Sequence, residues 1–287
     1  MEITWKWAAC GYTLMGYKST EEVISLCKYA GISAIEMNTG FINGKDNKEI
    51  EKMAQDYKNN NIILYSFHLP FTEDDDISAF YEIKRKEVVK KMSRLIEQVS
   101  ILGNKVVILH PTTNYSDVNT EGIDRYLYQL GRSLEVLLPE AEKLNLTIAI
   151  ENMPPNSSGT RFGSLPEHFT IMTKKFSHPN FGFCLDTGHA NISVGQDGPN
   201  IFFEVMKKNI VAFHLQDNPG DRDLHIAPGY GRVNWKDVFT KMSAIRFTHP
   251  ACIETPPFGY LINSTYTPDD WRELFDKVDS LARNILK

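Results

Sequence analysis

The stretch FGFCLDTGH, residues 181–189, is an apolar run that stops on Asp186 and reaches His189 three residues later. Consecutive apolar positions are typical of a parallel strand that is buried on both faces. Other apolar runs of the chain end in the same way, on the residues His68, His110, Glu151, His214 and Glu254. Polar side chains that repeatedly end buried strands predict that these strand ends converge on one functional site.

The strands alternate with helical stretches along the chain, and no linker or low-complexity segment interrupts them. We expect strands at residues 2–8, 33–37, 62–67, 105–109, 146–150, 181–185, 210–215 and 250–253. We expect helices at residues 20–30, 47–60, 77–102, 121–144, 166–175, 200–208, 235–244 and 268–285. Repeated β/α alternation predicts a (β/α)8 TIM barrel that forms a single domain over residues 1–287. An open doubly wound sheet is the alternative, but no GxGxxG motif follows a strand.

The composition is that of an ordinary globular protein, with 42% hydrophobic residues, 23% charged residues and a net charge of −5. This mild acidity provides no electrostatic footprint for nucleic acid or for an anionic membrane surface. No stretch approaches the roughly 20 apolar residues of a membrane span, and the N-terminus lacks the pattern of a signal peptide. The cysteines are scattered without a CxxC motif, which indicates buried free thiols in a reducing compartment. We therefore expect a cytoplasmic protein without nucleic-acid or membrane partners.

Four of the strand-end residues, Glu151, Asp186, His214 and Glu254, end the fifth to the eighth expected strands. In a (β/α)8 barrel the C-terminal ends of the strands form the active site. Three carboxylates in one small pocket would repel each other strongly unless a cation lay between them. One imidazole with three carboxylates suits Mn²⁺, Mg²⁺, Co²⁺ or Zn²⁺. The sequence therefore predicts one divalent metal ion at these four residues.

A second candidate set consists of His189, Asp223 and His225. Asp223 and His225, which flank Leu224, can point to one side of an extended loop. His189 follows Asp186 by three residues. These three residues could hold a second metal ion or bind substrate hydroxyl or phosphate groups, and we favour substrate binding.

Two further histidines, His68 and His110, end the third and fourth expected strands. With Glu151 as a bridging carboxylate they could hold a third metal ion, and the favoured alternative is substrate contact by neutral imidazoles. The remaining histidines lack a strand-end context and are expected to be structural or exposed.

Together these motifs resemble the xylose isomerase-like barrel superfamily, in the sugar phosphate isomerase/epimerase branch that also contains endonuclease IV. The motifs are HLP at 68–70, HP at 110–111, EN at 151–152, LDTGHA at 185–190, HLQDN at 214–218, DLHIAPGYGRVNW at 223–235 and IET at 253–255. Barrels of this kind often self-associate through their outer helices, so a homo-oligomer is compatible with the resemblance.

The resemblance implies a metal-dependent isomerase or epimerase that acts on a sugar, a sugar phosphate or a polyol ketone through a metal-stabilised enediolate. Glu151 and Glu254 would then be catalytic acid/base residues as well as metal ligands, and His189 would contact the substrate. In endonuclease IV-like members the same nine positions hold three zinc ions and cleave abasic DNA, which is the main alternative. An inosose dehydratase-like lyase and a sugar-binding barrel without catalysis are the others.

The chain departs from both groups of relatives. Endonuclease IV-like proteins have a Ser-Tyr pair after the first histidine, where this chain has Leu69, Pro70 and Phe71. The expected strand-end loops lack the basic residues that grip DNA phosphates. Ketose 3-epimerases have a second glutamate soon after the position of Glu151 and an arginine soon after that of His214, and neither is present. The resemblance therefore indicates a sugar or related substrate without assigning one particular compound.

Overall fold

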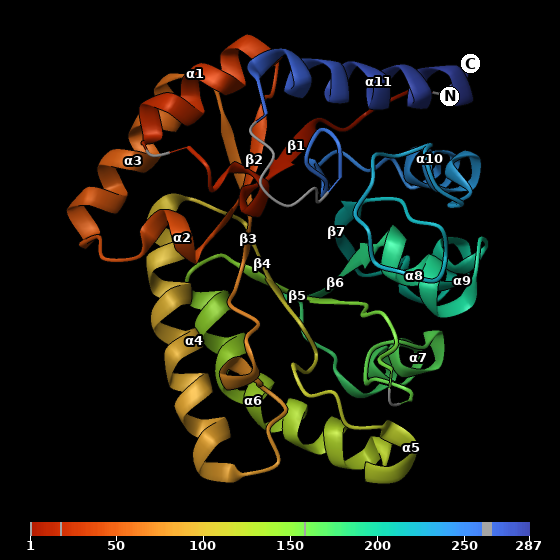
Figure 1. Cartoon of the computed structure of the whole chain (residues 1–287). Helices are drawn as coiled ribbons and strands as arrows, with labels where there is room; N and C mark the ends of the chain where they lie inside the picture. The colour runs from red at the N-terminus through yellow and green to blue at the C-terminus, as the bar shows by residue number, and fades with distance from the viewer. Residues whose placement is uncertain (1, 18, 158, 260–265) are drawn as a thin grey trace.

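The computed structural model describes residues 2–17, 19–157, 159–259 and 266–287. Within these ranges parallel strands pair in chain order, and β8 closes the ring by pairing with β1. The strands are β1 (Trp7–Cys10), β2 (Ala34–Asn38), β3 (Ile63–His68), β4 (Val106–Leu109), β5 (Thr147–Glu151), β6 (Phe181–Asp186), β7 (Ile210–Leu215) and β8 (Ala251–Ile253). The predicted (β/α)8 barrel is therefore confirmed (Figure 1).

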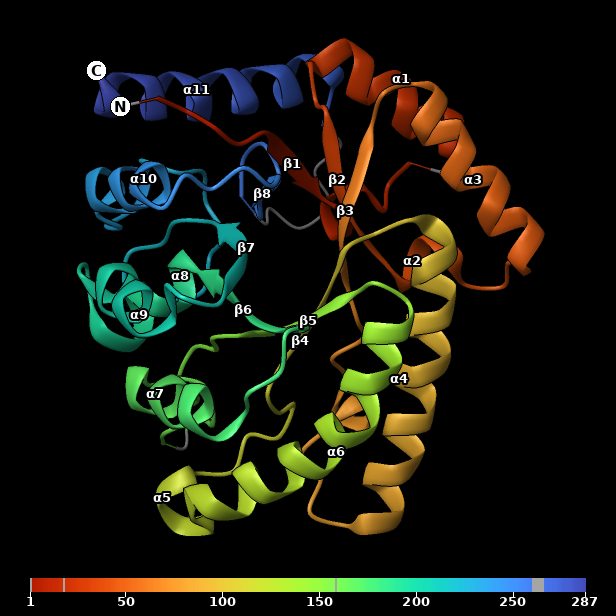
Figure 2. The same ribbon diagram turned by 180° about the vertical axis from the view of Figure 1, so that it is seen from behind.

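Helices surround the ring of strands on the outside, as the two opposite views in Figures 1 and 2 show. The main ones are α1 (Thr20–Ala30), α3 (Asn47–Asn59), α4 (Glu82–Leu102), α6 (Ile123–Lys143), α7 (Pro166–Lys175), α9 (Gly198–Met206), α10 (Trp235–Ala244) and α11 (Pro268–Leu286). Short helical turns in the loops are η1 (Gly11–Leu14), α2 (Thr39–Ile42), η2 (Glu73–Asp75), α5 (Val118–Glu121) and α8 (Thr187–Val194). The last helix packs between α1 and α10, which closes the helical ring.

The first strand differs from its prediction at residues 2–8. Residues 2–6 form no strand, and β1 starts at Trp7 and continues to Cys10. Trp5 is buried because its ring stacks on Phe239 of α10, with centroids 6.2 Å apart. The apolar character of this segment thus reflects packing against a helix rather than strand pairing.

Two helix starts also differ from the predictions. The helix expected from residue 77 begins at Glu82, because Ser78 lies in a buried loop and its Oγ donates to the carbonyl of Pro111 at 2.6 Å. The helix expected at 121–144 begins at Ile123, because Gly122 has a φ of 83° and separates α5 from α6. Both differences lie in strand-end loops, where side-chain hydrogen bonds and glycine override helical periodicity.

The short helix α8, which the sequence pattern did not predict, connects β6 directly to the site. Asp186 is its N-cap, and a side-chain oxygen of Asp186 accepts a hydrogen bond from the His189 amide at 2.6 Å. The Asp186 carboxylate therefore also fixes the first turn that carries His189.

The core occupies both faces of the sheet. Phe183 of β6 packs against Phe169 of α7, which in turn contacts Phe202 of α9, with centroid distances of 5.3 and 5.7 Å. All four cysteines are free and buried, as predicted. Among the described helices, none has the length and apolar character that a membrane span requires.

The buried His168 makes the stability of this barrel sensitive to acid. Its Nδ1 accepts hydrogen bonds from the amides of Gly163 and Leu165 at 3.0 and 3.4 Å. Burial lowers the pKa of His168 to about 4, from an ordinary value of 6.5. The unfolded chain thus takes up this proton at higher pH than the folded chain, so stability is lost as pH falls.

We expect the free energy of unfolding to decrease by up to about 3 kcal/mol through His168 between about pH 6.5 and pH 4. In the His168→Asn variant the amide oxygen replaces Nδ1 as an acceptor and cannot be protonated. Urea unfolding at several pH values should show a shallower acid dependence for this variant. Equal slopes in the two proteins would contradict the assignment.

Candidate metal centre

Four residues from successive strands bring their ligand atoms together at the C-terminal ends of the strands. Glu151 ends β5, Asp186 ends β6, His214 lies in β7 and Glu254 follows β8. One ligand atom of each lies within 4.8 Å of the other three. The strand register contributes to this, because Asp186 pairs directly with His214. The predicted metal-binding residues therefore form one buried cluster.

The centre of this cluster is the imidazole of His214, which is fully buried. Its Nδ1 lies 3.0 Å from Oε1 of Glu151 and 3.3 Å from Oε2 of Glu254. The two glutamates thus meet the same ring nitrogen from different strands.

Two buried carboxylate oxygens of the cluster lack a hydrogen-bond partner among the residues that the structure describes. These are Oδ2 of Asp186 and Oε2 of Glu254, and the contact of the latter with Nδ1 of His214 at 3.3 Å is not a hydrogen bond. Burial raises the pKa of Glu254 well above its usual range, and repulsion from Asp186 raises it further. Burial likewise raises the pKa of Asp186. This donor set fits a hard or borderline divalent cation, which would compensate the buried carboxylates.

Glu36 of β2 belongs to the site although the sequence analysis did not select it. It is 1% exposed, and its two carboxylate oxygens lie 3.0 and 3.1 Å from Nε2 of His214. Ser66 Oγ donates to the same carboxylate at 2.8 Å. A carboxylate that accepts the Nε2 proton leaves the lone pair of Nδ1 free to face a metal ion. The signal in the sequence was a charged residue in the middle of the buried strand SAIEM.

We expect the Glu36→Gln variant to bind an added divalent ion such as Mn²⁺ about 10- to 100-fold more weakly than the wild type. The neutral amide orients His214 less firmly and makes Nδ1 a weaker ligand. Competition with a chromogenic chelator measures the affinity, and the exposed Glu51→Gln on α3 is the matched control. Unchanged affinity in Glu36→Gln would show that Glu36 does not support the centre.

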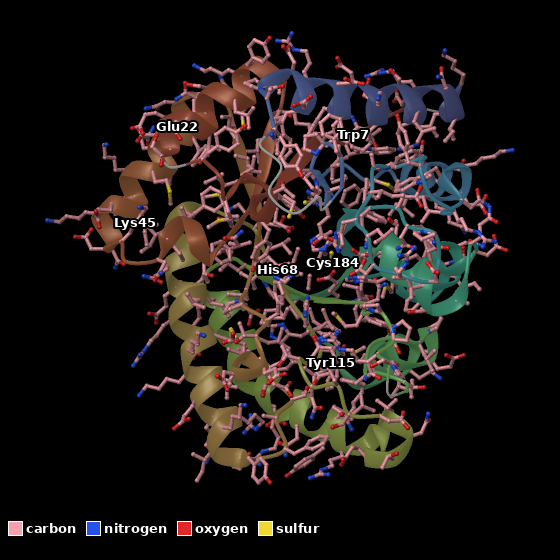
Figure 3. The ribbon with its side chains drawn as sticks, viewed as in Figure 1. Trp7, Glu22, Lys45, His68, Tyr115 and Cys184 are labelled. Atoms are coloured by element: carbon pink, nitrogen blue, oxygen red, sulfur yellow. The ribbon has the colours of Figure 1, made fainter. Side chains whose placement is uncertain are left out.

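Two further imidazoles contact the other carboxylate oxygen of Glu151, the one that does not face His214. Nε2 of His68 and Nε2 of His110 lie 3.2 and 3.4 Å from Oε2 of Glu151. Burial alone would raise the pKa of Glu151, but the imidazoles of His214, His110 and His68 hold it well below its usual value. Figure 3 labels His68 near the middle of the ring of strands. Glu151 thus lies between His68 and His110 on one side and His214 on the other.

His189, Asp223 and His225 form a second cluster beside the first, which we call the outer cluster. Oδ2 of Asp223 lies 3.3 Å from Nε2 of His189 and 3.2 Å from Nε2 of His225. Gln216 joins the clusters, because its Nε2 donates to Asp186 at 3.2 Å and to Asp223 at 3.0 Å. Burial opposes the charge on His189, yet Asp186 and Asp223 raise its pKa to about 10.

Three histidines of the site are oriented by backbone carbonyls through Nδ1. The pairs, each at 2.8 Å, are His68 with Leu69, His189 with Asn152 and His225 with Glu254. A carbonyl only accepts hydrogen bonds, so Nδ1 carries a proton in each ring. Each Nε2 then faces a carboxylate, and that contact requires a proton or a cation between the two atoms. Histidines that bind metals show this arrangement.

The loop that carries Asp223 and His225 is tied to one buried carboxylate. Asp217 accepts hydrogen bonds from the amides of Asn218, Gly229, Gly231 and Val233 and from Nε1 of Trp235, at 2.8 to 3.0 Å. A Cβ on Gly231 would lie 2.2 Å from Oδ1 of Asp217, so only glycine fits there. Trp235 is buried and begins α10.

An aromatic wall borders the His68 side of the centre. Phe71 stacks on His110, with ring centroids 4.7 Å apart, and contacts Tyr12 edge-on at 5.4 Å. Its ring is 41% exposed, so one face remains open to solvent. The residues that replace the Ser-Tyr pair of endonuclease IV thus give this wall an apolar surface.

The family model described as xylose isomerase-like TIM barrel matches residues 24–281. The chain belongs to this family. Among its relatives is the uncharacterized protein MJ1311 of Methanocaldococcus jannaschii, which is 28% identical over 83% of this chain and 79% of that protein. The "Probable endonuclease 4" of Shouchella clausii is 27% identical over 57% of this chain and 58% of that protein.

Solved structures with this fold include sugar epimerases. A D-tagatose 3-epimerase-like protein has a TM-score of 0.78 at 22% identity and covers 98% of this chain and 100% of its own. D-psicose 3-epimerase, solved in the presence of D-fructose, has a TM-score of 0.77 at 17% identity, with 98% and 99% covered. At these identities the likeness concerns the fold.

Proposed function

We propose that this chain is a metal-dependent isomerase or epimerase that acts on a sugar, a sugar phosphate or a related polyol ketone. The observation that carries the proposal is the position of Glu151 and Glu254 on one imidazole nitrogen, 3.0 and 3.3 Å from Nδ1 of His214, inside a buried carboxylate cluster. Family membership and the epimerases that share the fold support it.

Glu151, Asp186, His214 and Glu254 would hold one divalent ion. When bound, this ion supplies a Lewis acid that acidifies the C–H bond beside a substrate carbonyl. The oxygen and nitrogen ligands suit Mn²⁺, Mg²⁺, Co²⁺ or Zn²⁺.

The two glutamates would move the proton. They come from β5 and from the segment after β8, which are three strands apart in the ring. They therefore approach a substrate from different sides. One carboxylate removes the proton from the carbon, and the other returns a proton to the opposite face or to the neighbouring carbon. The first outcome is epimerisation and the second is isomerisation.

The outer cluster would hold the substrate. The side chains of His189, His225 and Asp223 are 8%, 13% and 33% exposed, so they become more accessible in that order. The two imidazoles and the carboxylate suit hydrogen bonds with substrate hydroxyl groups. His68 and His110 would contact the substrate near the aromatic wall.

The test is turnover of a panel of ketoses, ketose phosphates and inososes by protein from which metal has been removed, before and after Mn²⁺ or Co²⁺ is added. We expect product only after the metal is restored, with NMR identifying the new epimer, isomer or dehydration product. Metal-independent turnover, or no turnover of any member of the panel, would contradict the proposal.

An endonuclease IV-like zinc phosphodiesterase is the second candidate. The specific observation in its favour is that His68 and His110 share one oxygen of Glu151 while His189 and His225 share one oxygen of Asp223. With the central cluster, these groups could hold three zinc ions. The loop after β3 disfavours it, because its exposed Glu73 and Asp74 would repel DNA phosphates. Three bound zinc ions together with cleavage of abasic DNA would establish this function instead.

A further inference from the structure

A pair of thiols lies on the far side of His214 from the metal centre. Cys10 ends β1, Cys252 lies in β8, and Glu36 of β2 is the register partner of Cys10. The two sulfur atoms and one oxygen of Glu36 all lie within 4.8 Å of one another. The three residues are 0%, 2% and 1% exposed, so this cluster is fully inside the barrel.

The two carboxylate oxygens of Glu36 differ in their hydrogen bonds. Oε2 of Glu36 accepts hydrogen bonds from Ser66 and His214, at 2.8 and 3.1 Å. Oε1 lies 3.0 Å from the same His214 nitrogen, yet it receives no hydrogen bond from any residue that the structure describes. The thiols cluster with the small side chains of Ala8 and Ala34, and the partly buried Tyr12 packs against this group. One buried carboxylate oxygen beside two thiols therefore remains without a hydrogen bond.

We propose that Cys10, Cys252 and Glu36 form a second cation site, which takes a soft, thiophilic divalent ion such as Zn²⁺ or Cd²⁺. Thiolates select such ions over Mg²⁺ or Mn²⁺. With Zn–S bonds of about 2.3 Å, two thiolates on one tetrahedral ion stand about 3.8 Å apart, so the atoms need to approach by about 1 Å at most. Each thiol releases its proton to solvent on binding, and no oxidation takes place.

The strand register favours an ion over a disulfide at this position. Cys252 pairs with Ala8, so Cys10 lies two residues further along the neighbouring strand. Two residues of strand span about 6.6 Å and adjacent strands are about 4.8 Å apart, which places the two Cα atoms about 8 Å from each other. A disulfide requires a separation below about 7 Å.

The proposed thiol site and the metal centre would be connected through Glu36 and His214. Glu36 orients His214 through Nε2, and the metal centre uses Nδ1 of the same ring. An ion on Glu36 would compete for this carboxylate and loosen its hold on His214. The site thus offers a route by which thiophilic ions change the main centre without occupying it.

The test is titration of the metal-free protein with Cd²⁺ while sulfur-to-metal charge-transfer absorption is followed in the ultraviolet. The main centre has only oxygen and nitrogen ligands and cannot produce this band. We expect the band in the wild type and in Asp186→Asn, and its loss in Cys10→Ala/Cys252→Ala. The matched control is Cys27→Ala/Cys184→Ala, which removes two other buried thiols and should retain the band.

The Cys27→Ala/Cys184→Ala variant keeps Cys10 and Cys252 as its only thiols. It therefore tests the proposed site without relying on a variant in which the site is removed. No band in that variant, with cooperative thermal unfolding retained, would overturn the proposal. A band that persists in Cys10→Ala/Cys252→Ala would overturn it as well.

Discussion

Replacing Glu151 by glutamine is expected to lower kcat/KM for the responding sugar by about 10³-fold or more. Oε1 of Glu151 contacts His214 and Oε2 contacts His68 and His110, so its charge serves both groups. The amide has the same size, but it cannot take up the substrate proton and is a weak metal ligand. Steady-state kinetics and elemental analysis of the purified variant measure the two effects separately.

The matched control is Glu97→Gln on the exposed face of α4, which should leave the activity and the metal content unchanged. If the metal remains bound in Glu151→Gln while kcat falls, proton transfer is the main role of this residue. Activity of Glu151→Gln within about tenfold of the wild type would exclude it as an acid/base group.

Replacing Asp217 by alanine is expected to lower the free energy of unfolding by at least about 3 kcal/mol, because each buried donor left unsatisfied costs about 1–3 kcal/mol. Its carboxylate is 0% exposed and accepts bonds from both arms of the 217–235 loop. The same change should release Asp223 and His225 from their positions and raise KM. Urea unfolding and steady-state kinetics test the two consequences.

Asp221→Ala is the control for this prediction, since Asp221 lies in the same loop with an exposed side chain. It should change stability by less than about 0.5 kcal/mol. Equal stabilities of the Asp217 and Asp221 variants would contradict the role assigned to Asp217.

Much of the fold could be predicted because parallel strands buried on both faces are continuous apolar runs. The strands around Glu151, Asp186 and His214 follow this pattern closely. The first strand was displaced because Trp5 is buried by a helix and not by strand pairing. A sequence pattern reports burial, and it does not report which element covers a residue.

The predicted site residues lie together because the barrel brings strand ends into one place. Glu36 was missed because it lies inside a strand, whereas the prediction rested on polar residues at strand ends. Gln216 was missed for a related reason, since its function depends on joining Asp186 to Asp223. Such links depend on three-dimensional distances that spacing along the chain does not contain.

The central claim is that Glu151 and Glu254 move a proton at a substrate carbon, and solvent-hydrogen exchange tests it most directly. The metal-loaded protein is incubated in deuterated water with the responding ketose, and NMR follows the carbon beside the carbonyl. We predict deuterium at that carbon with the wild type and a rate at least about 100-fold lower with Glu254→Gln. Product that forms without deuterium, or exchange that continues at the wild-type rate in both glutamate variants, would contradict the claim.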